Sequence, residues 1–304
     1  MNPESFVQGF LGFFKVTSLL LIILEISLLI EEFFKNRIEF RKGFTGTKSS
    51  IAKTLQRHAL KVLRMEGDLK AHFGTALGCT FIFLTAGLLP VWSNEIVLHA
   101  PHSLWVFLGM SMIGPTLALI FQWTQKSGSG WPFVLSHAER SIGSATVLFI
   151  LGIALVAMTG SDSFSEIQKS QEAGGGLVFQ YPLSIILMFA LVVINLFLSF
   201  QTMFSKSDTE VKHHGWTLDD LIPHLRRTIW SLFIVDTFLG GAHGVMGNGL
   251  LILKCVILNV SSEVLSCLFV RLREDQAESF ILWKLTPISI LILTLSLFLP
   301  SGCT

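Results

Sequence analysis

Charged residues are scarce in this 304-residue chain, where they make up 14% of the sequence against 51% for hydrophobic residues. A soluble domain typically carries about a quarter charged residues. Uncharged runs such as 73–92 and 146–160 approach or reach the length of about 20 residues that crosses a bilayer. The composition therefore argues against a soluble two-domain protein and predicts a single integral membrane domain over residues 1–304.

The sequence also lacks the motifs of self-contained catalysis. Its four cysteines lie far apart with no Cys-x-x-Cys, which argues against a disulfide framework and a zinc or iron–sulfur site. P-loop and nucleophile motifs are missing, and only His243 falls clearly within a span, whereas haem ligation needs paired histidines. Lys and Arg total 22 against 21 Asp and Glu, so nothing indicates nucleic acid. We expect a non-catalytic chain with no metal or cofactor of its own.

Apolar segments of spanning length predict an all-α protein with about eight transmembrane helices. The sixth segment is interrupted by glycines between 240 and 249, so its outer end is expected to be bent or unwound. The expected spans lie near 6–30, 73–93, 103–123, 142–160, 182–204, 228–246, 249–270 and 280–299.

The cations are distributed unevenly among the loops. Segments 31–72, 124–141, 205–227 and 271–284 hold ten, two, four and three Lys and Arg, which is 19 of the 22. The opposite side holds only Lys169, and Lys15 and Lys254 fall inside spans. By the positive-inside rule the four cation-rich loops are cytoplasmic and both termini lie outside the plasma (inner) membrane.

The first cytoplasmic loop, 31–72, contains apolar residues at helical spacing from Ile51 to Leu63, with basic residues on the other face. This pattern predicts an amphipathic helix at the headgroup boundary, and a plain cation-rich loop is the alternative. The loop 205–227 is the most polar stretch of the chain.

Five ionisable residues fall inside the predicted spans, where each costs at least about 2.5 kcal/mol if it faces lipid. They are Lys15, Glu25, Asp236, Lys254 and Glu263. At a rise of about 1.5 Å per residue, Asp236 and Glu263 fall near mid-membrane, with Glu25 toward the cytoplasm. Carboxylates at staggered depths suit a proton relay. The alternative is structural pairing, for example of Asp236 with Lys254.

The C-terminal third resembles a known family. Residues 271–276 read RLREDQ and residues 283–287 read WKLTP. These motifs are similar to the end of subunit 1 of respiratory NADH:quinone oxidoreductase (complex I), and to the corresponding membrane subunit of formate hydrogenlyase and energy-converting hydrogenases. Residues 41–43 (RKG), 61–66 (KVLRME) and 139–140 (ER) resemble further family motifs in the same order. Of these segments, only 271–287 is specific enough to identify the family resemblance.

The chain departs from the family pattern at three places. Phe44 replaces the proline that follows the first turn motif, and no acid occurs in 141–152, where the family has a glutamate. The acid-rich loop after the fifth span is thinned to 205–210, followed by a basic Lys-His-His. The chain is thus either a divergent member coupled to a different redox module or an anchor whose transport role has decayed.

The resemblance implies a membrane-anchor and coupling subunit of a complex-I-like or hydrogenase-like oxidoreductase. Its partners would be a hydrogenase-like large subunit and an iron–sulfur subunit on the cytoplasmic side, with antiporter-like subunits beside it in the bilayer. Iron–sulfur clusters, and NiFe or quinone, would belong to those partners. The implied docking residues are Arg41, Lys42, Arg64, Arg140, Arg271 and Arg273. The implied proton-path residues are Glu25, Asp236, Glu263 and Lys254 in the spans, with Glu66, Glu139, Asp208, Glu210 and Asp275 at the entrance.

Two other functions remain open from the sequence. A stand-alone secondary transporter would use the glycine-broken sixth span as a midplane site, but such transporters often have two broken helices in matching positions and only one is evident here. A non-pumping membrane scaffold is the other, since the expected acids are missing.

Overall fold

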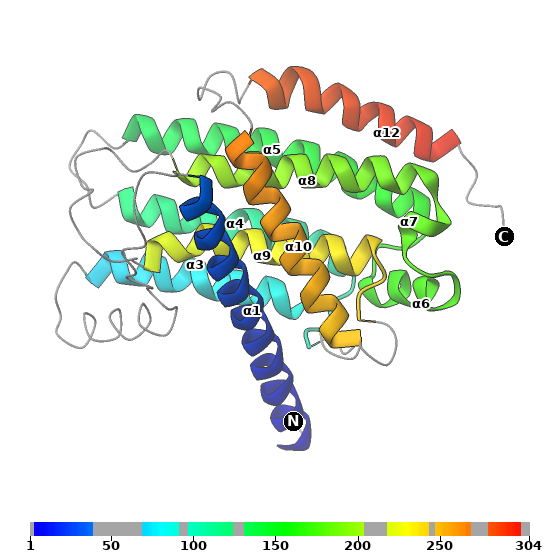
Figure 1. The fold of residues 1–304 in the computed structure, drawn as a ribbon, viewed down its shortest axis with the longest axis horizontal. Helices are drawn as coiled ribbons and strands as arrows, with labels where there is room; N and C mark the ends of the chain where they lie inside the picture. The colour runs from blue at the N-terminus through cyan, green and yellow to red at the C-terminus, as the bar shows by residue number, and fades with distance from the viewer. Residues whose placement is uncertain are drawn as a thin grey trace.

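The computed structural model describes residues 3–38, 69–90, 97–123, 131–203, 218–242, 247–268 and 279–298. These residues form helices and contain no strand, which confirms the all-α class for the described part (Figure 1). The helices are α1 (Pro3–Ile38), α3 (Leu69–Gly87), α4 (Ser103–Trp123), α5 (Trp131–Thr159), α6 (Phe164–Gly174), α7 (Leu177–Gln180), α8 (Pro182–Met203), α9 (Leu218–Phe238), α10 (Gly247–Leu268), the π-helix η1 (Ile281–Leu285) and α12 (Thr286–Phe298).

Each of the eight expected spans overlaps helical residues, although the sixth, 228–246, shares only 228–238 with α9, and not all of these helices have the length and apolarity of a complete crossing. Among the described residues, Leu11–Leu28 and Ile281–Phe298 meet both criteria. A third crossing results if Gly143–Thr159 and Phe164–Glu172, which meet at a 45° bend, form one span. The shorter apolar helices are Ala76–Gly87, Ser103–Ile113, Pro182–Leu196 and Gly247–Ser262. The number of eight spans therefore stays a prediction.

Helix α9 lies at the centre of the bundle and contacts α1, α3, α6, α7, α8 and α10. Helices α5, α8 and α12 pack against one another, and α4 joins α5 to α3. Figure 1 shows α1 (blue) and α10 (orange) side by side, both crossing α9 (yellow). Polar residues of α9 are consequently enclosed by neighbouring helices, which is where polar groups in a membrane protein are tolerated.

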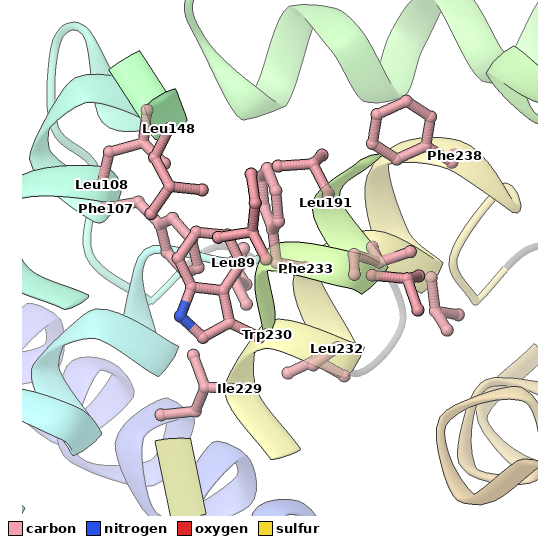
Figure 2. Close-up of a cluster of buried hydrophobic side chains, with 14 of the residues drawn as sticks. Leu89, Phe107, Leu108, Leu148, Leu191, Ile229, Trp230, Leu232, Phe233 and Phe238 are labelled. Atoms are coloured by element: carbon pink, nitrogen blue, oxygen red, sulfur yellow. The ribbon is translucent and has the colours of Figure 1, made fainter. Parts of the chain in front are cut away.

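An aromatic cluster holds α9 to α4 and to the start of α6. The rings of Phe107 and Phe233 stack with centroids 4.7 Å apart, and Trp230 meets both edge-on at 5.6 and 5.5 Å. Phe164 at the start of α6 meets Phe107 and Phe233 at 5.8 and 5.9 Å. Figure 2 shows these α4 and α9 rings surrounded by leucines from α5, α8 and the end of α3. Such aromatic pairs add about 0.5–1.5 kcal/mol each beyond their buried area, so α9 is firmly fixed.

Large apolar side chains cover the outside of the bundle instead of being confined to its core. On the last helix Trp283 is 76% exposed and Phe298 is 84% exposed, and Phe189 on α8 is 64% exposed. The interior holds serines, asparagine and two arginines. This distribution is that of a helical membrane protein, because lipid or membrane partners cover the apolar exterior.

The last helix begins with a π-helical turn that its sequence explains. The backbone N–H of Thr286 donates to Ile281 O, five residues back, and Thr286 Oγ1 donates to the same oxygen at 3.1 Å. Pro287 follows and has no N–H to donate to the turn below it. Turns of this kind appear frequently at functional sites, and this one overlaps the WKLTP segment at residues 283–285.

Helices α6 and α7 fall in the segment 161–181, for which the sequence predicts only a loop. Gly160, at φ 74°, ends α5. The start of α4 then fixes the start of α6, because Asp162 Oδ2 lies 2.6 Å from His102 Nδ1 and accepts a bond from Trp105 Nε1 at 3.1 Å. In return Phe164 N donates to Ser103 Oγ at 2.9 Å. These contacts place α6 over the C-terminal end of α9.

Candidate functional site

The C-terminal end of α9 is broken as the glycine pattern predicts. The helix stops at Phe238, and Gly240 and Gly241 adopt φ values of 77° and 49°, which favour glycine. Both Leu239 N and Gly241 N donate to Val235 O, at 3.0 and 3.2 Å. This turn folds back so closely that a side chain on Gly241 would collide with Asp236 Oδ1. The break therefore encloses the Asp236 carboxylate.

Asp236 lies deeper along its helix than the expected span implied. Because α9 begins at Leu218, Asp236 is about 27 Å from its start and in its last turn, rather than near its middle. Its side chain is buried, at 7% exposure. A carboxylate so placed stands at the end of α9 opposite the cation-rich loops.

Lys254 of α10 lies close to this carboxylate without pairing with it. Lys254 Nζ donates to the carbonyl oxygen of Leu239 at 2.7 Å, and no ion pair with Asp236 is present in this described part of the chain. The two charges are still near enough to interact electrostatically. The ammonium thus stabilises the broken end of α9 through the Leu239 carbonyl.

Three neutral side chains join α1, α9 and α10 farther toward the cation-rich side. Ser231 Oγ of α9 donates to Asn259 Oδ1 of α10 at 2.5 Å, and Asn259 Nδ2 donates to Ser27 Oγ of α1 at 3.2 Å. All three are buried, with exposures of 0%, 4% and 7%. Hydrogen bonds between helices are the polar contacts expected inside a membrane bundle.

Six polar residues lie on the three helices α1, α9 and α10, and this set is here called the polar seam: Asp236, Lys254, Ser231, Asn259, Ser27 and Glu25. Asp236 is five residues from Ser231 on α9, and Lys254 is five residues from Asn259 on α10, so each step is about 7.5 Å. Glu25, half-buried on α1, lies two residues from Ser27, so the two side chains leave different sides of that helix. The polar seam therefore runs through the contact of three helices toward the cation-rich side.

A small cavity of about 10 Å³ adjoins the polar seam on the cation-rich side. Its polar lining comes from Ser27, His224, Arg227, Thr228 and Asn259. This volume is about that of a single water, and the lining offers several hydrogen-bonding partners. The site can thus hold one ordered water between the hydrogen-bonded serines and the N-terminal half of α9.

The structure brings some predicted residues together and does not describe others. Glu25, Asp236 and Lys254 lie on three helices in mutual contact. Glu263 stands one turn beyond Asn259 on α10, and of Glu263, Glu139 and Arg140 only the backbone is described. The predicted amphipathic helix, the 205–227 loop before Leu218, and the following residues lie outside the described part: Arg41, Lys42, Arg64, Glu66, Asp208, Glu210, Arg271, Arg273 and Asp275.

Sequence reasoning missed the neutral members of the polar seam and two buried arginines. Arg226 and Arg227 were counted with the polar loop, but both are inside α9 and are 7% and 5% exposed. Arg226 Nη2 contacts Met112 Sδ at 3.2 Å. The spacing of Arg227 and Ser231 was the available signal for these two residues, since i and i+4 residues share a helix face.

Replacing Asn259 with alanine is expected to lower the free energy of unfolding by about 1–3 kcal/mol. The change removes both interhelical hydrogen bonds and leaves Ser231 and Ser27 without their partner. Thermal and denaturant unfolding of the detergent-purified chain measures this. Ser289→Ala is the matched control, because its buried hydroxyl donates only to Thr286 O of the same helix. Equal stability of the two variants would contradict the role assigned to the polar seam.

The fold is that of a helical membrane protein, and the polar seam lies on three helices that contact one another. Its fold is similar to a chain in the structure of the membrane-bound sulfane sulfur reductase (MBS), an archaeal respiratory membrane complex, with a TM-score of 0.72 and 19% sequence identity. The match covers 96% of this chain and 99% of that chain. No family model matches the sequence, and no curated protein matches it. At this identity the likeness establishes a shared fold.

Proposed function

We propose that this chain is the membrane-anchor and coupling subunit of a multi-subunit respiratory oxidoreductase complex. The observation that carries the proposal is the fold shared over 96% of the chain with a member of such a complex. The motifs at 271–276 and 283–287 support it independently, because they resemble the complex I and energy-converting hydrogenase membrane subunits. In this proposal the redox reaction takes place in partner subunits, and this chain anchors them in the bilayer and couples the reaction to events in the membrane.

The cation-rich loops are the proposed docking surface for a hydrogenase-like subunit and an iron–sulfur subunit. Nineteen of the 22 Lys and Arg lie in these four segments, and apart from Arg226 and Arg227, which are buried in α9, they would attract acidic surfaces of soluble partners. The docking residues in this proposal are Arg41, Lys42, Arg64, Arg140, Arg271 and Arg273. The exposed apolar faces of α8 and α12 are available to antiporter-like membrane partners or to lipid.

Proton conduction along the polar seam is the second part of the proposal. Buried ionisable groups inside a membrane protein commonly belong to proton relays. Glu25, Asp236 and Glu263 would exchange protons through water, which the hydroxyls of Ser27 and Ser231, the Asn259 amide and the water-sized cavity would hold in place by hydrogen bonds. Lys254 would adjust the charge state of Asp236 without forming a tight ion pair with it. Entrance groups would lie in the cation-rich loops.

Affinity purification of the full-length chain from native membranes in mild detergent tests the complex. We expect it to be recovered together with iron–sulfur-containing soluble subunits and further membrane subunits, identified by mass spectrometry and by iron content. Isolation as a monodisperse single chain that transports a solute after reconstitution would instead support the transporter function, and it would refute the complex.

Reversing the charge of Arg271 and Arg273 tests whether they bind a partner subunit or only set the orientation of the chain in the membrane. Arg271→Glu combined with Arg273→Glu is expected to reduce recovery of the soluble subunits, because it places like charges opposite an acidic partner surface. Lys169→Glu is the matched control, since this exposed lysine lies on α6, on the face opposite the cation-rich loops. Equal loss of partners in both variants would contradict docking through residues 271 and 273.

A further inference from the structure

A cavity of about 360 Å³ opens at the junction of α6, the end of α9 and the start of α10. It is lined by Gln171, Glu172, Gly175, Gly176, Leu239, Gly240 and Lys254. These residues lie at the C-terminal end of α9, remote from its start at Leu218 (Figure 1). The lining combines apolar surface with a lysine, a carboxylate and an amide, which are groups that are costly to leave against lipid.

Buried polar atoms beside this cavity have no protein partner within the described residues. Gln171 is 1% exposed, and its Nε2 donates to Thr237 O while its Oε1 has no partner. Gln168 Nε2 and Thr237 Oγ1 are likewise buried and unpartnered. Buried polar atoms are normally satisfied, and ordered water is the usual partner where the protein supplies none. Three such atoms on α6 and α9 therefore indicate water between the cavity and the end of α9.

The charged groups of the cavity favour water over an apolar occupant. Lys254 Nζ is held at the cavity wall by Leu239 O, 2.7 Å away, and Glu172 is exposed at the rim. Lysine keeps its ammonium hydrated whenever its stem can reach water. The Glu172 carboxylate at the mouth and the Lys254 ammonium at the wall are charges of opposite sign, and both are more stable in water than in lipid. The volume accommodates several water molecules.

We propose that this cavity is a water-filled vestibule, open only on the face opposite the cation-rich loops, through which Lys254 and the adjoining end of the polar seam contact that aqueous phase. This proposal rests on the proposed function, because it assigns the vestibule as the outer opening of the proton path. A proton leaving the polar seam would pass to water in the vestibule and then to bulk solvent, with no other reactant required.

Cysteine accessibility tests the vestibule in the full-length chain within its native membrane assembly. Lys254→Cys and, separately, Leu239→Cys are treated in sealed vesicles of either orientation with a charged, membrane-impermeant thiosulfonate, and labelling is read by mass spectrometry. Leu239→Cys keeps Lys254 and the Leu239 carbonyl, so it remains informative if Lys254→Cys does not fold. Leu253→Cys is the matched control: it adjoins Lys254 on α10 and is 55% exposed on the apolar exterior. Wild-type labelling gives the background of the native cysteines.

We expect the vestibule cysteines to react at least about tenfold faster than Leu253→Cys, and only from the face opposite the cation-rich loops, because the reactive thiolate forms in water and not in lipid. Labelling by a lipid-soluble maleimide alone would show that lipid fills the cavity and would overturn the proposal. Labelling from the cation-rich face, or none from either face, would overturn it too. Recovery as a single chain with this labelling intact would count against the proposed function alone, whereas absent labelling in an intact complex would count against the vestibule alone.

Discussion

Asp236→Asn is expected to reduce charge translocation per redox turnover by about tenfold or more, while the complex still assembles. Asparagine has nearly the shape of aspartate, so it fits against Gly241 as the carboxylate does. It cannot take up or release a proton, and a relay through the end of α9 would stop there. Glu263→Gln is expected to act in the same direction on α10. The measurement is the membrane potential generated by reconstituted complex, divided by the rate of electron transfer.

Two companion variants make this result specific. Asp236→Glu restores a titratable group and is expected to recover part of the translocation. Asp162→Asn removes a carboxylate at the same end of the bundle, where it is bonded to His102 and Trp105 and lies outside the polar seam, so translocation is expected to be retained. Normal pumping by both Asp236→Asn and Glu263→Gln would refute the relay and leave the chain as a non-pumping scaffold.

Gly176→Ala is expected to destabilise the protein by about 1–3 kcal/mol or more, the range for overpacking a tight contact. The added Cβ would stand 2.6 Å from Phe238 O and 2.9 Å from both Gly240 N and Leu239 C. All three atoms belong to the backbone, so no side chain can rotate away. Because φ at Gly176 is −59°, alanine itself adopts that conformation readily, and the cost comes from the collision. Thermal unfolding of the purified chain measures it.

Gly249→Ala is the control for this steric effect. It lies near the start of α10, and an added Cβ there meets nothing within 4 Å. Its stability is expected to be unchanged or slightly raised, since alanine favours the helix over glycine. A similar loss at both positions would mean that close packing between the α6–α7 turn and α9 does not stabilise this end of the bundle.

Helix positions followed largely from the sequence because long apolar runs have few alternatives inside a membrane. The glycines at 240 and 241 also indicated the break in α9, since positive φ is costly for other residues. The start of α9 was misplaced by ten residues, from 228 to Leu218, because Arg226 and Arg227 suggested a solvated loop. Helix α6 was missed because its sequence is short and polar, although Phe164 and Ile167 bury one face.

The candidate site was predictable only in its charged members. Glu25, Asp236 and Lys254 are conspicuous in apolar surroundings, so their presence inside spans identifies them. Ser27, Ser231 and Asn259 are neutral and common in membrane helices, so no local pattern distinguishes them. They matter because they form hydrogen bonds between distant parts of the sequence: Ser231 and Asn259 are 28 residues apart, and Asn259 and Ser27 are 232 residues apart.

The scarcity of charge indicated from the sequence alone that this is a membrane protein, and the concentration of Lys and Arg in four segments predicts one cation-rich face. Both features are local: each run of residues partitions into lipid or water by its own composition. Only the tertiary structure decided that α1, α9 and α10 meet along the polar seam and that α6 leaves a polar cavity beside Lys254. Helical periodicity indicates which residues share a face, but the partner that covers that face depends on how the whole bundle packs.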